Sequence, residues 1–138
     1  MFVSGLGFIM ISDEKFIYVY NNDEKILYKS YFGNITIYDI TSSWDIAIEQ
    51  QLIPQGTIGV INNFLEARFD FNSLNDFKKI PEYYQQNLNT FSGLRFAIVT
   101  VSPKDMVVPV LVKEYDKGYE SRPFSTVEAA RQWILERF

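Results

Sequence analysis

From Phe16 onward, segments with the composition of β-strands alternate with segments patterned as helices. Runs rich in Val, Ile, Phe and Tyr predict strands at residues 16–20, 26–32, 57–65 and 95–101, and a further short strand is expected at 120–124. The polar turn at 21–23 predicts that the first two strands form an antiparallel hairpin, and Gly33 is expected to end the second. Helices between the later strands require right-handed crossovers, so a mostly parallel sheet is expected.

The first two predicted helices follow the second and third strands. Thr36, with Asp39 three residues later, is expected to cap the first helix. The second helix is expected to be capped by Asn72 or Ser73. Pro81 lies inside its apolar pattern, and proline lacks the N–H that a helix interior uses. A kink, or a second short helix starting there, is therefore predicted.

The last two predicted helices carry their own start signals. Ser102 followed by proline opens the third, although the Val-rich composition of residues 106–115 would also suit a strand, and Pro109 is expected to bend either one. The fourth is expected to begin with a capping box in which Ser125 is the cap and Glu128 the third helical residue. Trp133 lies beside the apolar stripe of this final helix, which is predicted to pack on the sheet.

The N-terminal segment, residues 1–15, is predicted to be either an extension or an extra strand. Residues 1–11 are apolar, but too short to span a membrane and without the basic residues that open a signal peptide. This segment either adds a strand or is a leader upstream of a true start at Met10. Residues 16–138 are expected to form a single domain.

Composition narrows the chemistry that this chain can perform. It contains neither His nor Cys, which removes disulfides, thiolate nucleophiles, Cys-based zinc sites and His-dependent catalytic triads. The formal charge is −4, and neither half carries the basic surface that nucleic acid requires. We therefore expect a cytoplasmic protein that is not an enzyme, holds no cofactor or metal, does not span a membrane and does not bind nucleic acid.

Three local patterns, with the order of elements, resemble a known fold. They are Tyr-Phe-Gly-Asn-Ile-Thr at 31–36, Gly-Leu-Arg-Phe-Ala-Ile-Val at 93–99, and the segment 122–134, where Phe124 leads into a capped helix bearing Trp133. The chain resembles the STAS (anti-sigma factor antagonist) fold, in its small stand-alone bacterial branch related to CRAL-TRIO lipid-binding domains. The resemblance implies an α/β fold with a mostly parallel four- to five-stranded sheet, an antiparallel N-terminal strand and about four helices.

The resemblance also implies functions, and this sequence departs from two of the family's patterns. STAS-like proteins act as phosphorylation-switched binding partners or as sensors of nucleotides or lipids. The regulatory serine corresponds to Ser73, a phosphorylation candidate, but the preceding Asp and the small neighbouring residues are absent, so a helix-capping role competes with it. Where relatives carry Asp-x-Arg after the central strand, this chain has Asn63-Phe64-Leu65.

Candidate ligand-binding residues follow from the topology, because ligands of open α/β sheets bind outside the carboxyl ends of the strands. Those ends carry Asn63, Arg68, Asp70, Ser102 and Lys104. The alternative is a solvated loop with weak surface ion pairs. A second group consists of aromatic side chains that either line an apolar ligand pocket or belong to the core: Phe64, Phe69, Phe71, Tyr83 and Tyr84.

Three functions are favoured after these exclusions, and an enzyme of unknown type is a fourth and least favoured alternative. The first is a non-enzymatic binding or regulatory module that acts through protein–protein contacts, with a protein partner or as a homodimer. The second is a carrier of a small apolar molecule or lipid, with its pocket at the carboxyl ends of the strands. The third is a phosphorylation switch at Ser73.

Overall fold

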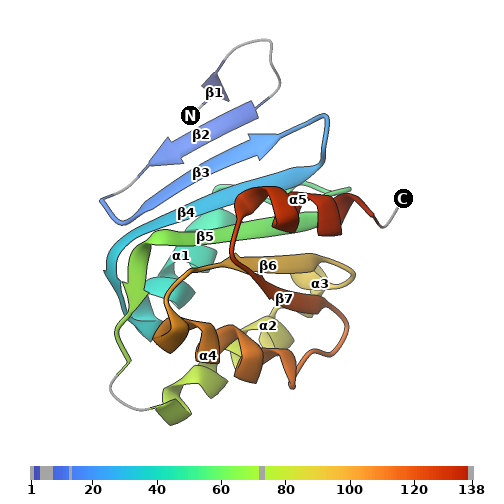
Figure 1. Cartoon of the computed structure of the whole chain (residues 1–138). Coiled ribbons are helices and arrows are strands. Elements are labelled where there is room, and N and C mark those ends of the chain that lie inside the picture. Colours follow the sequence, from blue (N-terminus) through green and yellow to red (C-terminus); the bar gives the residue numbers. More distant parts are fainter. Residues whose placement is uncertain (1, 4–7, 13, 72–73, 137–138) are drawn as a thin grey trace.

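Strands in the computed structural model, which describes residues 2–3, 8–12, 14–71 and 74–136, join into one sheet (Figure 1). The described residues form seven strands in chain order: β1 (Phe2–Val3), β2 (Phe8–Ser12), β3 (Phe16–Asn21), β4 (Ile26–Ile35), β5 (Gly59–Phe69), β6 (Arg95–Val99) and β7 (Glu120–Phe124). Neighbours from β1 to β4 are antiparallel, and those from β4 to β7 are parallel. The predicted mixed α/β sheet, with β3 antiparallel ahead of four parallel strands, is confirmed.

The helices lie on both faces of this sheet. They are α1 (Ile37–Glu49), the 3-10 helix η1 (Leu74–Lys78), α2 (Lys79–Gln86), α3 (Leu88–Phe91), α4 (Pro103–Lys113) and α5 (Val127–Leu135). Buried residues of α1 to α4 share one hydrophobic cluster, and those of α5 pack in a second cluster on the other face. The sheet is therefore the middle layer of a three-layer α/β fold.

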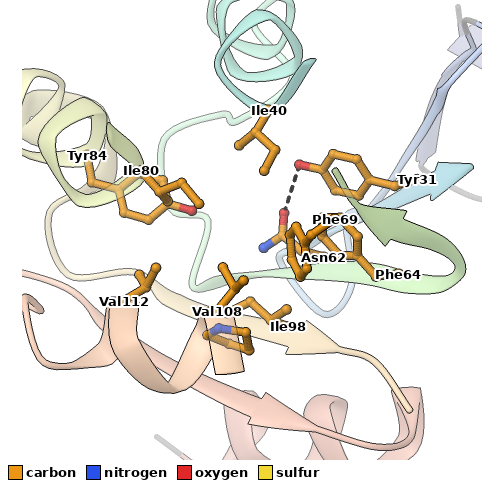
Figure 2. Close-up of a pocket in the computed structure, with 11 residues that line it drawn as sticks. Tyr31, Ile40, Asn62, Phe64, Phe69, Ile80, Tyr84, Ile98, Val108 and Val112 are labelled. Carbon is orange, nitrogen blue, oxygen red and sulfur yellow. Dashed lines mark hydrogen bonds between the residues drawn. The ribbon is translucent and has the colours of Figure 1, made fainter. Parts of the chain in front are cut away.

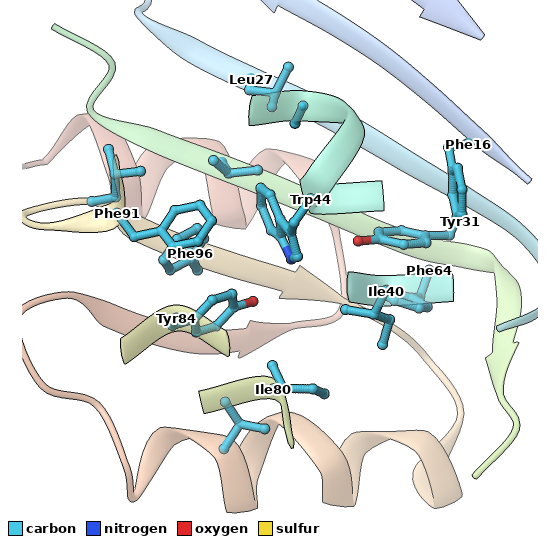
Figure 3. Packing of buried hydrophobic residues seen from close by; sticks show 14 of the residues in the cluster. Phe16, Leu27, Tyr31, Ile40, Trp44, Phe64, Ile80, Tyr84, Phe91 and Phe96 are labelled. Carbon is cyan, nitrogen blue, oxygen red and sulfur yellow. The ribbon is translucent and has the colours of Figure 1, made fainter. Parts of the chain in front are cut away.

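Aromatic packing organises the larger core (Figure 3). The buried indole of Trp44 from α1 meets the rings of Tyr84, Phe91 and Phe96 edge-on, at centroid separations of 6.0, 5.1 and 5.6 Å. Tyr84 and Phe96 stack at 4.7 Å. Edge-to-face and offset stacking are the favoured geometries of aromatic pairs, so the high aromatic content of the chain is used to join α1, α2, α3 and β6.

Gly33 does not end the second predicted strand. It adopts a φ of +81°, which glycine reaches without the Cβ clash that other residues meet, and β4 continues through it to Ile35. The pairing of β4 with β5 shifts register between Ser30 and Phe32 and then resumes to Ile35 opposite Phe69. Both strands therefore extend beyond the predicted ends, because each provides the other's hydrogen-bonding partner.

The predicted starts of the first two helices have different outcomes. The capping box of α1 is confirmed: the Asp39 N–H donates to Thr36 Oγ1 at 3.1 Å, and the Thr36 N–H donates to Asp39 Oδ2 at 2.9 Å. The predicted break near Pro81 is also confirmed, since η1 gives way to α2 at Lys79, two residues before the proline. Asn72 and Ser73, the predicted caps, lie outside the described residues.

The last two helices form where predicted, but the cap of α5 is one residue later. The Ala129 N–H donates to Thr126 Oγ1 at 3.1 Å, so Thr126 and not Ser125 is the N-cap. Extended backbone angles at Thr126 (φ −136°, ψ 151°) are those that a cap requires. Glu128 instead lies 3.6 Å from Arg131. In α4, Pro109 lies inside the helix as expected.

The N-cap at Thr126 can be tested with its neighbour Ser125 as the control. Thr126→Ala is expected to reduce the free energy of unfolding by about 1 kcal/mol, because an N–H at the start of α5 loses its acceptor. Ser125→Ala, one residue earlier, is expected to change it by less than about 0.5 kcal/mol. Urea denaturation of both variants measures the difference. A larger loss for Ser125→Ala would show that the predicted box is the real one.

Candidate functional site

Two open clefts lie at the carboxyl ends of the parallel strands, where α1 and α4 begin. One, of about 390 Å³, is lined by Phe69, Asp70, Phe71, Lys104, Asp105, Val107 and Val108. The other, of about 450 Å³, is lined by Thr36, Ile37, Tyr38, Thr41, Asp70, Phe71, Asp76 and Lys79. Asp70 and Phe71 separate the two clefts, and the Asp70 N–H donates to the Ile35 carbonyl at 2.8 Å, which fixes this segment beside the end of β4.

The structure brings most of the predicted ligand-binding residues to this place. Asp70 and Lys104 line the same cleft. Arg68 extends from the end of β5 toward α4, with its Nε 3.9 Å from Asp105 Oδ2. Ser102 is the N-cap residue of α4, although its side chain accepts no capping hydrogen bond. These four residues therefore gather around the start of α4, and their role in binding stays a prediction.

Asn63 is not part of this group. Its neighbours Asn62 and Phe64 line a cavity on the α1 side of the sheet. Because successive side chains of a strand alternate between faces, Asn63 points to the opposite face. Its Oδ1 accepts from the Leu65 N–H at 2.9 Å, so the side chain is used locally. Ser73, the phosphorylation candidate, lies outside the described residues.

Asp105 is the most unusual group at the clefts. Its side chain is only 2% exposed, although the residue lies in the first turn of α4. In the described part of the chain Oδ2 has no hydrogen-bond donor, and its ion pair with Arg68 is long. The sequence did not single out Asp105, since burial of a residue at a helix start depends on what packs over it.

A small, partly open pocket lies next to the clefts, between the sheet and helices α1, α2 and α4 (Figure 2). Phe64, Phe69 and Tyr84 line it, together with Tyr31, whose hydroxyl donates to Asn62 Oδ1 at 3.5 Å. Its volume is about 30 Å³, which suits a single water molecule. Ligand pockets hold roughly 300 Å³ or more, so this pocket is too small for a lipid, and the predicted ligand pocket at the strand ends stays a prediction.

A second chemically unusual group, Lys29, lies in the core. It is fully buried, and its Nζ has no hydrogen-bond partner in the described structure. The Nζ lies 3.4 Å from the ring centroid of Trp44, 4.9 Å from that of Tyr31 and 5.9 Å from that of Tyr18. Burial lowers the pKa of the Lys29 ammonium well below its ordinary value, because the charged form loses its hydration.

Apolar side chains are exposed around the clefts. Tyr38 at the start of α1 is 76% exposed, Val101 after β6 is 59% exposed and Val107 in α4 is 43% exposed. Sequence reasoning missed all three, because the pattern of a strand or helix does not say which apolar residues are left uncovered by neighbouring elements. Exposed apolar surface beside a cleft is typical of protein-binding sites, and Tyr38 and Val107 each line one of the two clefts.

The described residues contain no group of three or more Asp, Glu, His or Cys side chains placed to hold a metal ion. None of their helices is both long enough and apolar enough to cross a membrane.

Comparison with known proteins identifies the fold. No protein-family model matches the chain, and no curated protein matches it. Among solved structures, it is similar to an uncharacterized protein from the DUF3478 family with a SpoIIAA-like fold, from Shewanella loihica PV-4. That similarity has a TM-score of 0.53 and 16% identity, and covers 97% of this chain and 99% of the other. The unphosphorylated anti-sigma factor antagonist SpoIIAA gives a TM-score of 0.43 with 14% identity, over 93% and 97% of the two chains.

The similarity to the Shewanella protein shows the fold and nothing beyond it. The chain has a SpoIIAA-like, and hence STAS-like, α/β fold, as the sequence patterns predicted. Because one fold serves many functions, the function has to be inferred from the site itself.

Proposed function

We propose that this protein is a non-enzymatic binding or regulatory module that contacts a protein partner at the carboxyl ends of its parallel strands. The observation that carries this proposal is the exposure of Tyr38 and Val107, each of which lines one of the two open clefts. Tyrosine is among the residues that contribute most to binding energy in protein interfaces. An exposed tyrosine next to a cleft is therefore a suitable anchor.

Helix α4 adds independent support. Val108, Pro109 and Val112 are buried against the core, while Val107 and Val110 on the other side of the helix are exposed. A surface helix of a monomer normally turns polar residues outward, and a helix that is apolar on all sides is normally covered on all sides. We infer that the partner covers the outer side of α4.

The chemistry of the clefts favours binding over catalysis. Their side chains are aromatic, aliphatic, Asp, Thr and Lys, in a chain without His or Cys. The side chain best suited to proton transfer near neutral pH is therefore missing from the sequence. The small volume of the pocket between the sheet and α1, α2 and α4 also favours recognition at the surface over storage of a ligand inside the domain.

Site-specific cross-linking tests the proposal. A photoreactive residue at Val107 is expected to form discrete adducts with a partner in a lysate of the source organism. The same residue at Gln132, exposed on α5 at the opposite face, serves as the control. Equal labelling from both positions, or none from Val107, would contradict the proposal.

Once the partner is isolated, the contribution of the anchor can be measured. Tyr38→Ala is expected to weaken the affinity at least about tenfold, the effect of losing a well-packed interface tyrosine. Gln132→Ala is expected to leave the affinity unchanged. Isothermal titration calorimetry with the purified partner gives both values, and an unchanged affinity for Tyr38→Ala would exclude this residue as the anchor.

A further inference from the structure

The carboxylate of Asp105 is buried without the donors that a buried charge needs. Its side chain is 2% exposed, and Oδ2 receives no hydrogen bond in the described part of the chain. The nearest cation is Arg68, whose Nε lies 3.9 Å away, beyond hydrogen-bonding distance. Arg68 is itself 57% exposed, and its Nη1 donates to the Ala67 carbonyl at 2.9 Å. Arg68 therefore satisfies Asp105 only in part.

The cleft in front of Asp105 has the form of a side-chain pocket. Phe69, Phe71, Val107 and Val108 provide apolar walls, and Asp70 adds a second, exposed carboxylate. No ion pair engages Asp70 in the described structure. An aliphatic stem that ends in a cation would contact both the apolar walls and the carboxylates, as long basic side chains do elsewhere.

An anionic ligand fits this place less well. The start of α4 and the exposed Lys104 both attract negative charge. However, the Asp105 carboxylate already occupies the first turn of this helix, and Asp70 lies in the same cleft. An incoming anion would meet two carboxylates, whereas an incoming cation would complete their hydrogen bonds.

We propose that the cleft between Phe71 and α4 receives a Lys or Arg side chain of the protein partner, which replaces Arg68 at Asp105. This inference rests on the proposed function and adds the chemistry of the partner: a basic residue flanked by apolar ones that contact Val107. Charge complementarity supports it, since the whole chain carries a formal charge of −4. In this arrangement Arg68 is an internal competitor that holds the carboxylate until the partner arrives.

Titration of the full chain with a small probe tests the inference. Nα-acetyl-arginine amide is added to the ¹⁵N-labelled protein, and the amide signals of Asp70, Phe71 and Asp105 are expected to shift in a saturable way. Nα-acetyl-norleucine amide, which has a similar stem without the charge, is the control ligand and is expected to leave them unchanged. Asp105→Asn is expected to weaken binding of the arginine probe at least tenfold. Arg68→Gln is expected to tighten it several-fold.

Glu114→Gln is the matched control variant, because Glu114 is an exposed carboxylate at the far end of the same helix. It is expected to bind the probe as the unaltered protein does. Asp105→Asn is expected to keep or raise the melting temperature, whereas a structural capping role would lower it. If that variant fails to fold, Asp70→Asn at the exposed side of the cleft replaces it, with an expected several-fold loss of binding.

The results separate this inference from the function on which it rests. Unchanged probe binding by Asp105→Asn or Asp70→Asn, or weaker binding by Arg68→Gln, overturns the inference. Shifts of the same amide signals with protein concentration, without any probe, would show that a second copy of the chain occupies the cleft and would also overturn it. Partner cross-links from Val107 combined with no probe binding would leave the proposed function standing while the basic side chain is excluded.

Discussion

Lys29→Met is expected to make the protein more stable by about 1–4 kcal/mol at pH 7, the range known for replacing buried ion pairs by apolar residues of similar volume. Lys29 lies fully buried among Trp44, Tyr31 and Tyr18 without a carboxylate partner. A cation–π contact contributes about 2 kcal/mol when desolvated, which is less than the several kcal/mol that burying an ammonium costs. Burial therefore disfavours the charged form of Lys29, and the folded state carries this cost.

The dependence of stability on pH shows whether the buried amine of Lys29 causes the expected gain in stability. The pKa of Lys29 is lowered in the folded protein and ordinary in the unfolded chain. Between these two values the unfolded chain binds one more proton, so the free energy of unfolding rises with pH by about 1.4 kcal/mol per unit. The penalty for burying Lys29 is absent above the pKa of the unfolded chain. It grows as the pH falls from that pKa to the lower pKa of the folded protein, so stability is lost over this range. Lys29→Met is expected to abolish this slope.

Urea denaturation between pH 6 and 10 measures both effects. Lys117→Met is the control, because Lys117 is an exposed lysine whose replacement is expected to change stability by less than about 0.5 kcal/mol and to keep the slope. A destabilised Lys29→Met variant with the original slope would show that the ammonium is charged in the core and held there by the aromatic rings.

The sequence predicts the starts of helices better than the ends of strands. The helices beginning at Thr36 and Pro103 were predicted correctly because their start signals are local: a capping box in one, proline at the first position in the other. The ends of β4 and β5 were not, because Ile35 and Phe69 extend each other's strand from distant parts of the sequence. Local patterns cannot show such pairing.

At the candidate site too, the sequence predicted which residues lie together but not which of them are buried or exposed. Topology alone brought Asp70 and Lys104 to one cleft, since both follow parallel strands. The burial of Asp105 and the exposure of Tyr38 depend on tertiary packing and were not foreseen. The burial of Lys29 could have been predicted from the sequence. Lys29 alternates with Leu27 and Tyr31 along the strand, and alternate residues of a strand lie on the same face, which is the buried one here.

Gly59→Ala is expected to destabilise the protein by about 1–3 kcal/mol through overpacking. Gly59 begins β5 and lies between β4 and β6, with α5 above it. A Cβ atom there would lie 2.6 Å from Ile134 Cγ2 and 2.9 Å from the Arg95 carbonyl oxygen. The sign of the change in stability shows whether these contacts matter. Without them, Gly59→Ala would stabilise the protein, because a glycine in a strand interior is destabilising by about 0.5–1 kcal/mol relative to alanine.

A double-mutant cycle separates the two contacts. Ile134→Ala alone is expected to cost about 2–5 kcal/mol, because Ile134 is fully buried on the side of α5 that packs on the sheet. Combined with Gly59→Ala, the total loss is expected to be smaller than the sum, since the shortened side chain gives the new Cβ room. The Arg95 carbonyl belongs to the backbone of β6 and cannot be relieved in this way, so part of the cost remains. Strict additivity would show that Ile134 is not what excludes a side chain at position 59, and that the strand spacing alone requires glycine there.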